Sequence, residues 1–120
     1  PKGDVAGAVS AFLAGNYMAY HDKTVPDPDF KRLVEQMRGV LSSNARFTRS
    51  SPTQKREMYE QWAIVGTFMA AGREEIKRGS SGVDAAAQSR FRQAAKANLE
   101  SFLQTTVDRI HLGERGLALR

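Results

Sequence analysis

The stretch that decides the fold runs from Ser51 to Ile76 and reads SPTQKREMYEQWAIVGTFMAAGREEI. It opens with a capping box, in which Ser51 is the N-cap and Gln54 follows three residues later. Pro52 occupies the first helical position, where its missing N–H removes no helical hydrogen bond. The pattern therefore predicts a long helix that begins after Ser51 and ends near Gly79.

The apolar residues of this stretch recur at spacings of three and four, so they lie on one face of the predicted helix. The seam consists of Met58, Trp62, Val65, Met69, Gly72 and Ile76. We expect it to pack against other helices. The exposed face is expected to carry a mixture of charges, namely Lys55, Arg56, Glu60 and Arg73.

Two helices are predicted before this stretch. The first runs from about Asp4, a good N-cap, to about His21. In the second, Asp27 is the expected cap, Pro28 takes the first position, and the apolar periodicity continues to about Ser43. The segment 44–50 is predicted to be a loop whose Phe47 is anchored in the core.

A fourth helix is predicted to follow a capping pattern at Ser81 and Asp84 and to continue to about Thr105. Its expected core stripe is Ala87, Phe91, Ala94, Ala95, Leu99, Phe102 and Leu103. Glycines inside three of the predicted helices indicate close approach between helix backbones, because each costs about 1 kcal/mol against alanine. These glycines are Gly15, Gly39 and Gly66.

The tail, residues 107–120, changes from helical to alternating periodicity. Ile110 and Leu112 alternate with polar residues, and the segment from Gly113 to Gly116 can turn the chain. This pattern favours a short β-hairpin, with an irregular extended tail as the alternative. Two strands alone are marginally stable in water, so a hairpin must lean on the helices or pair with another chain.

Together these patterns predict a mainly α fold: one domain, residues 1–120, built as a four-helix antiparallel bundle with a short C-terminal β-hairpin or extended tail. A chain of 120 residues can bury a sufficient core without disulfides, and this one has no cysteine. It has no apolar run near the roughly 20 residues that span a bilayer, so we expect no transmembrane helix. The apolar seams can be satisfied within one chain and do not argue for a dimer.

The charge balance is basic, with 18 Lys and Arg against 13 Asp and Glu. Between Glu35 and Glu57 the chain has no acidic residue. This interval holds a candidate patch for an anionic partner, either nucleic acid or a phospholipid surface. The patch consists of Arg38, Arg46, Arg49, Lys55 and Arg56. A solvated basic loop is the simpler interpretation.

Residues with catalytic or metal-ligating spacing are not evident. His21 and His111 have no neighbour at a metal-ligand spacing, and whether they meet in space is left open. No nucleophile motif or phosphate-binding loop occurs, so we expect no catalytic residue, no metal and no cofactor. A cavity between helices, near Tyr17, Tyr20, Tyr59 and Trp62, is a further possibility for a small ligand.

Four short segments resemble an uncharacterised bacterial family. They read DVAGA at 4–8, NYMAY at 16–20, VEQMRGVL at 34–41 and KREMYEQ at 55–61. The resemblance covers roughly residues 4–112. It implies a C-terminal helical domain of a protein of unknown function, exported to the periplasm or secreted, and it carries over no catalytic or binding residue.

Three functions remain open at this level. The first is a non-catalytic interaction or structural module of an exported protein, which binds a protein partner through a helix face or the tail. The second is electrostatic binding of an anionic polymer or lipid through the basic patch. The third is a small-ligand carrier or enzyme that uses an inter-helix cavity.

Overall fold

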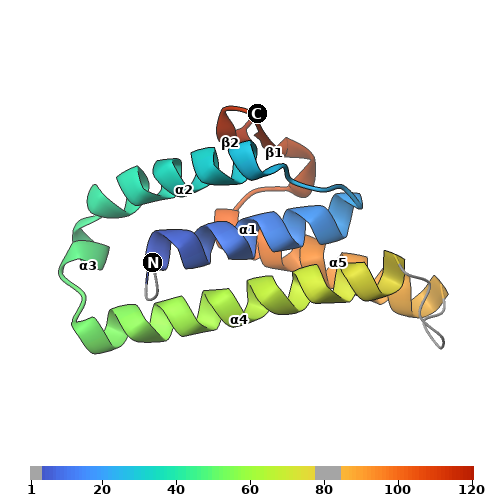
Figure 1. Cartoon of the computed structure of the whole chain (residues 1–120), viewed down its shortest axis with the longest axis horizontal. Helices are drawn as coiled ribbons and strands as arrows, with labels where there is room; N and C mark the ends of the chain where they lie inside the picture. The colour runs from blue at the N-terminus through green and yellow to red at the C-terminus, as the bar shows by residue number, and fades with distance from the viewer. Residues whose placement is uncertain (1–3, 78–84) are drawn as a thin grey trace.

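A computed structural model of the chain describes residues 4–77 and 85–120 (Figure 1). The described elements are α1 (Val5–His21), α2 (Asp27–Ser42), α3 (Ala45–Thr48), α4 (Pro52–Lys77), α5 (Ala85–Leu103), a 3-10 helix (Val107–Arg109), β1 (Ile110–Gly113) and β2 (Gly116–Leu119). Long helices that follow one another in the chain run in opposite directions (Figure 1). The predicted mainly α bundle with a C-terminal hairpin is therefore confirmed.

The first long helix, α1, lies at the centre of the molecule. Twelve of its 17 residues are buried, against three of the 26 residues of α4. In Figure 1, α2 lies above α1, α4 lies below it and α5 lies behind it, and all three contact it. The helix that begins after Ser51 therefore packs on the outside of the fold, and the Ala- and Gly-rich α1 is the central helix around which the others pack.

Two of the predicted N-caps are confirmed. The Gln54 N–H donates to Ser51 Oγ at 3.1 Å, and the Ser51 N–H donates to Gln54 Oε1 at 2.8 Å. At α1 the Ala6 N–H donates to Asp4 Oδ1 at 3.1 Å. The cap of α2 was predicted one residue too late: Pro26, with extended backbone, holds the cap position, and Asp27 is already helical.

The helices α1 and α4 run in the same direction (Figure 1). Small residues allow their backbones to come into close contact. A Cβ atom added at Gly66 would lie 2.7 Å from the carbonyl oxygen of Ala11, and one added at Gly15 would lie 2.6 Å from the carbonyl oxygen of Gly66. The predicted close approach is therefore confirmed at these two glycines. It is wrong for Gly39, which has no atom within 4 Å of such a Cβ.

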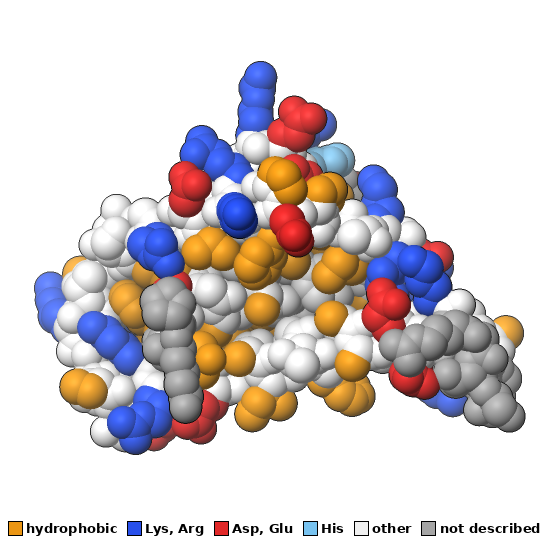
Figure 2. All heavy atoms as spheres, viewed as in Figure 1, with side chains coloured by type: hydrophobic (Ala, Val, Ile, Leu, Met, Phe, Trp, Pro, Cys, Tyr) orange, Lys and Arg blue, Asp and Glu red, His pale blue; other side chains and the backbone are white. Residues whose placement is uncertain are grey.

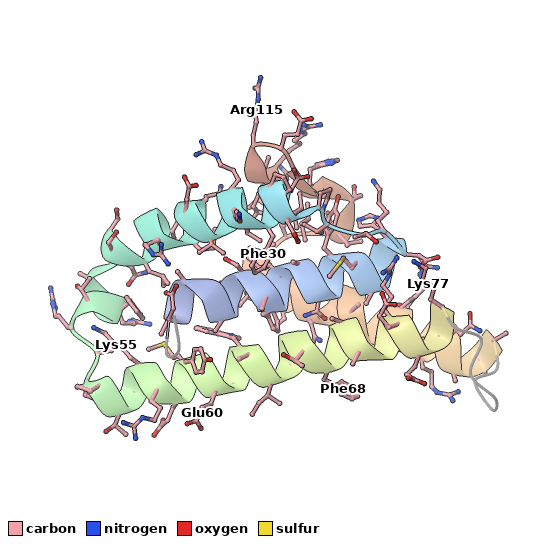
Figure 3. The ribbon with its side chains drawn as sticks, viewed as in Figure 1. Phe30, Lys55, Glu60, Phe68, Lys77 and Arg115 are labelled. Carbon is pink, nitrogen blue, oxygen red and sulfur yellow. The ribbon has the colours of Figure 1, made fainter. Side chains whose placement is uncertain are left out.

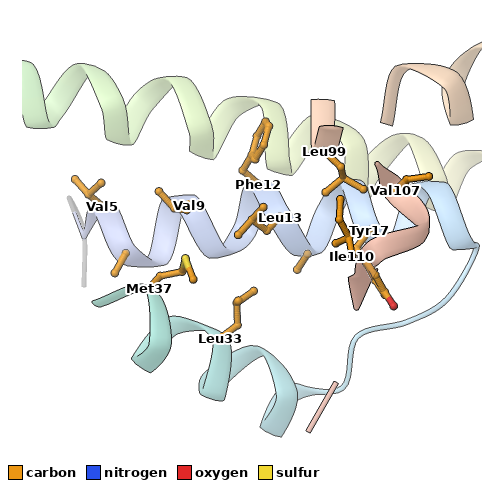
Figure 4. Packing of buried hydrophobic residues seen from close by; sticks show 12 residues of the cluster. Val5, Val9, Phe12, Leu13, Tyr17, Leu33, Met37, Leu99, Val107 and Ile110 are labelled. Carbon is orange, nitrogen blue, oxygen red and sulfur yellow. The ribbon is translucent and has the colours of Figure 1, made fainter. Parts of the chain in front are cut away.

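The core forms around α1 and includes side chains from α2, α5 and the tail (Figure 4). Its labelled members are Val5, Val9, Phe12, Leu13, Tyr17, Leu33, Met37, Leu99, Val107 and Ile110. A buried polar contact joins α1 to α5: Asn98 Nδ2 donates to Asn16 Oδ1 at 2.9 Å, and Asn16 Nδ2 donates to the Phe12 carbonyl at 2.8 Å. Asn16 is fully buried, and these bonds satisfy its amide.

The tail forms the hairpin that its alternating pattern favours. β1 and β2 pair antiparallel, with Gly113 opposite Gly116, and Gly116 has the positive φ of 87° that suits glycine. Gln36 of α2 holds the hairpin to the bundle. Its side-chain amide donates to the Leu117 carbonyl at 2.8 Å and accepts from the Leu117 N–H at 2.7 Å.

The remaining differences from the predictions are local. The segment 44–50 contains the one-turn helix α3, because Asn44 Oδ1 accepts from the Phe47 N–H at 3.0 Å; Phe47 does pack on the core. α5 ends at Leu103 because Gln104 has a left-handed backbone. Its expected core residue Ala94 is exposed, and Ala95 beside it is buried. The predictions at Gly79, Ser81 and Asp84 lie outside the described residues.

Among the helices of residues 4–77 and 85–120, not one has the length and apolar character needed to cross a bilayer. The prediction that these segments contain no transmembrane helix is confirmed.

Candidate functional site

The five basic residues of the predicted anionic-partner patch lie where α2, α3 and the start of α4 meet. Two of them have partners within the chain. Arg38 Nη2 pairs with Asp4 Oδ2 at 2.5 Å, and the Lys55 ammonium lies 5.1 Å from the centre of the Phe47 ring. These contacts fasten α2 to the start of α1 and α4 to α3, so Arg38 and Lys55 have structural roles.

The other three members of the patch are exposed. Arg46, Arg49 and Arg56 form no ion pair with any residue that the structure describes. Figure 2 shows basic side chains at this end of the molecule, with acidic side chains beside them at the start of α4. The patch is therefore smaller than the sequence indicates and lies next to opposite charge.

A groove runs along α1 on the face that points to the viewer in Figure 2. Within residues 4–18, four positions stay partly exposed: Asp4, Gly7, Ala11 and Met18. Their spacing places them on one side of the helix, and all four line depressions on this face. We call these depressions together the front groove; α1 forms its floor, and α2 and α4 form its walls.

The front groove consists of three depressions in a row. The largest, about 510 Å³, lies between Phe30 on the α2 side and Thr67 and Ala71 on α4 (Figure 3 shows Phe30). A second, of about 200 Å³, shares Ala11 with it, and a third, of about 330 Å³, shares Asp4 with the second. The largest is lined chiefly by alanine, glycine and other apolar residues, so its floor is shallow and apolar.

Opposite charges mark the two ends of the front groove. Arg38, Lys55 and Asp4 line the depression at the α3 end, and because Asp4 pairs with Arg38, the net positive charge there comes from Lys55. Asp27 and Glu74 line the depression at the other end. The groove is therefore an apolar channel with a basic end and an acidic end.

A second apolar pocket, of about 330 Å³, lies between α2, α4, α5 and the hairpin, and Trp62 and Phe102 line it. The four aromatic residues named for a ligand cavity do not meet in any one of the described pockets. Trp62 lines this pocket, and Tyr59 lines the front groove. Tyr17 is buried in the core, and Tyr20 contacts His21.

His21 lies at the C-terminal end of α1 and contacts two tyrosine rings. The Tyr17 ring is tilted against it with ring centres 4.4 Å apart, and the Tyr20 ring meets it edge-on at 5.0 Å. Burial lowers the pKa of His21, and the nearby charges of Lys23, Arg92 and His111 lower it further. No group of three or more metal-binding side chains occurs among the described residues.

Arg73 contradicts its predicted place on the exposed face of α4, because it is only 7% exposed. It lies against Asp22 at the end of α1 and against Glu74, with both N–O distances at 3.4 Å. The sequence contains a weak signal for this burial: Arg73 falls four residues after Met69, which belongs to the apolar seam.

The fold and the front groove define a class: a mainly α domain whose central helix is enclosed on three sides and open on the fourth. The chain belongs to a family of unknown function, DUF6683, whose model matches residues 1–120. The resemblance to an uncharacterised family is confirmed at this level. A search of curated proteins and a search of solved structures each find no significant match.

Proposed function

We propose that this domain is a non-catalytic interaction module that holds one helix of a partner protein in the front groove. The observation that carries the proposal is the open side of α1. α2, α4 and α5 cover the other sides of this helix, and Gly7, Ala11 and Met18 remain accessible on the fourth. A partner helix laid along the groove would complete the layer around α1 and bury this apolar floor.

The dimensions of the groove suit a helix of about four turns. The floor extends from Asp4 to Met18, and at a rise of about 1.5 Å per residue this stretch is about 21 Å long. Gly7 and Ala11 are partly exposed and have small side chains, which permit a partner backbone to approach closely. We therefore expect a partner helix with a narrow apolar stripe and small residues at its centre.

The charges at the groove ends specify the orientation of the partner. An acidic end of the partner helix would face Lys55, beside the Arg38–Asp4 ion pair, and a basic end would face Asp27 and Glu74. Such complementarity contributes more to specificity and to the rate of association than to affinity.

The test uses a synthetic helical peptide of 14 to 16 residues, with an Ala/Leu stripe, glutamates at one end and lysines at the other. Fluorescence anisotropy measures its binding to the full chain. We expect Thr67→Tyr, at an exposed position on the groove wall, to weaken binding at least tenfold.

The matched control is Phe68→Ser, the next residue of α4. Phe68 is 63% exposed and points away from α1 (Figure 3), so this variant should bind the peptide normally. A second peptide, with its acidic and basic ends exchanged but its stripe kept, should bind more weakly. Equal binding of both peptides to all three proteins would contradict the proposal.

A second candidate function is binding of an anionic polymer or membrane surface, and the three exposed arginines of the basic patch favour it. The test compares DNA, RNA and anionic liposomes at about 50 and 200 mM salt, because a contact with several phosphates weakens by orders of magnitude over that range. Loss of binding in an Arg46→Ala, Arg49→Ala, Arg56→Ala triple variant would support it. An affinity that is the same at both salt concentrations would count against this function.

We also propose that the domain is the C-terminal helical part of an exported bacterial protein. The support is the resemblance of the segments at 4–8, 16–20, 34–41 and 55–61 to such proteins. Immunodetection in fractionated cells of the native host tests this location. Recovery from the periplasm or the medium would support export, and recovery from the cytoplasm alone would contradict it.

A further inference from the structure

The Nε of the buried Arg73 side chain has no hydrogen-bond partner among the described residues. This side chain is 8% exposed, and its Nε is the one buried side-chain nitrogen or oxygen of the described residues without a hydrogen-bond partner. Nη1 donates to Glu74 Oε1 at the long distance of 3.4 Å. Because buried polar groups are almost always paired, the N–H at Nε is an unsatisfied donor, and an acceptor must displace a neighbouring group to reach this buried atom.

The Asp22 carboxylate beside Nε is a weak partner. Asp22 Oδ1 lies 3.4 Å from Arg73 Nε without forming a hydrogen bond, and the Asp22 side chain is 80% exposed. A charge-assisted N–H to carboxylate bond is shorter, about 2.7–2.9 Å. Water competes for so exposed a carboxylate, so Asp22 satisfies Arg73 only in part.

Arg73 lines a pocket of about 310 Å³ between α1, α4 and α5. This volume lies at the lower end of the range of small-molecule sites. Ala19, Ile76 and Phe91 form an apolar part of the wall. The pocket therefore combines a buried cation with a surface suited to a small apolar group.

Two further cations, Lys77 and Arg92, line the same pocket with the carboxylate of Asp22, and the Glu74 carboxylate lies against Arg73 at 3.4 Å. The guanidinium of Arg92 is held in place, because its Nε donates to the Tyr20 carbonyl at 3.0 Å and it stacks over the Tyr20 ring. The positive field extends to His21: after burial, the charges of Lys23 and Arg92 lower its pKa. An anion entering the pocket therefore meets three cations, of which Arg73 is buried and Arg92 is held in place, against two carboxylates.

We propose that this pocket, which we call the Arg73 pocket, binds a small carboxylic acid whose carboxylate accepts from Arg73 Nε and whose apolar body lies against Phe91 and Ile76. The acid displaces the exposed Asp22 carboxylate as the partner of Arg73. The planar guanidinium matches a carboxylate, and the apolar wall selects an organic acid over an inorganic anion. This site lies apart from the front groove and does not depend on the function proposed for it.

The test uses benzoate as the probe and NMR detection of the arginine Nε–Hε signals in the full chain. We expect benzoate to shift the Arg73 signal in a saturable manner. Benzamide, which has the same ring without the charge, and inorganic phosphate, which has charge without an apolar body, should bind at least tenfold more weakly. Equal binding of either one, or an unmoved Arg73 signal, would overturn the proposal.

Variants of the two paired groups distinguish a binding role from a structural one. Asp22→Asn removes the competing carboxylate and keeps a side chain that tolerates the left-handed backbone at residue 22, where φ is 53°. It should tighten benzoate binding several-fold, whereas the control Asp29→Asn on α2 should not. Unchanged or weaker binding by Asp22→Asn would overturn the proposal.

Arg73→Met should abolish benzoate binding while the circular dichroism spectrum stays helical. Retained binding by a folded Arg73→Met protein would also overturn the proposal. If this variant fails to fold, the Nε–Hε signal of the unmodified chain and the Asp22→Asn comparison decide the result.

Discussion

At the scale of single residues, α1 and α4 can lie close together because Gly15 and Gly66 have no Cβ atom. The backbone of Gly66 touches the backbone of α1 at Ala11 and Phe12. The same two helices meet again one turn later, where Gly15 lies against Gly66. This contact decides how closely the wall α4 approaches the central helix, and so how wide the front groove is.

We predict that Gly66→Ala destabilises the protein although alanine favours helices. The added Cβ would lie 2.7 Å from the Ala11 carbonyl oxygen, so the helices must move apart. The helix propensity gained is about 1 kcal/mol, and overpacking costs about 1–3 kcal/mol. Urea denaturation should therefore show a lower free energy of unfolding.

Gly39→Ala is the matched control for this prediction. Gly39 is also helical, but a Cβ there would meet nothing within 4 Å. It should raise the free energy of unfolding by about 0.5–1 kcal/mol through propensity alone. If both variants change the free energy of unfolding in the same direction, close contact with the α1 backbone is not the reason that position 66 requires glycine.

The second residue-scale prediction concerns the titration of His21. Burial, followed by the charges of Lys23, Arg92 and His111, lowers the pKa of His21 in the folded chain. The unfolded chain therefore binds a proton at a higher pH than the folded chain does. The stability contributed by neutral His21 is complete above its ordinary pKa of about 6.5, and it is lost as the pH falls toward the lower folded value.

We therefore expect the melting temperature to decrease from pH 7.5 to pH 5.5. NMR titration of the His21 ring should give a pKa below the ordinary value, and Lys23→Gln should raise it. The control Lys31→Gln removes an exposed lysine of α2 and should leave the His21 pKa unchanged. A His21 pKa at or above the ordinary value would refute this account.

At the scale of elements, α2 positions the C-terminal hairpin through two hydrogen bonds between the Gln36 side chain and the β2 backbone. The Gln36 amide donates to and accepts from the backbone of Leu117, which are the two bonds that a third strand would make there. These two hydrogen bonds stabilise the hairpin, because two strands alone are only marginally stable in water. They also occupy the edge of β2 at Leu117, where a partner strand would otherwise add.

Gln36→Ala should loosen the hairpin without unfolding the helices. Each of the two lost hydrogen bonds contributes about 0.5–1.5 kcal/mol, so we expect a loss of about 1–3 kcal/mol. The amides of the paired residues His111 and Ala118 should exchange faster with solvent. The control Gln61→Ala changes an exposed glutamine of α4 and should affect neither measurement; equal effects would show that Gln36 does not anchor the hairpin.

At the scale of the whole molecule, the helices are arranged around one axis rather than at four equal corners. The Cα radius of gyration is 14.7 Å, against about 13.6 Å for an average domain of 120 residues. The difference agrees with a layout in which α2 and α4 stand apart on either side of α1 (Figure 1). The depressions of the front groove lie along α1 in this arrangement.

We expect native-state hydrogen exchange to be slowest in α1. Twelve of its 17 residues are buried, so its amides should open only when the whole chain unfolds. The exposed α3 and the first turns of α4 should exchange through local opening, at a lower free energy. If α4 proves more protected than α1, the central role assigned to α1 is wrong.

Most features predicted correctly depend on residues close together in the chain. The capping box at Ser51 and Gln54, the cap at Asp4 and the turn between Gly113 and Gly116 are each local patterns. The structure departs from the predictions where partners are distant. Arg73 is buried against Asp22, which the periodicity of α4 alone does not indicate.

The candidate sites were predictable only in part, for the same reason. The basic patch is visible in the sequence, but the Asp4 carboxylate that pairs with Arg38 lies 34 positions away. The front groove has no sequence motif, because its floor consists of alanine and glycine, which also form ordinary helix contacts. The Arg73 pocket joins residues of three helices that the sequence does not order in space.

By itself, the amino-acid sequence determined the helices, most of their ends and the hairpin, because capping, periodicity and turn formation act over a few residues. The tertiary structure alone decided that α1 is the axis, that one side of it stays open and that Arg73 is buried. These outcomes depend on which apolar faces meet and how closely their backbones approach. That closeness is set jointly by α1 and α4, through small residues about 50 positions apart in the chain.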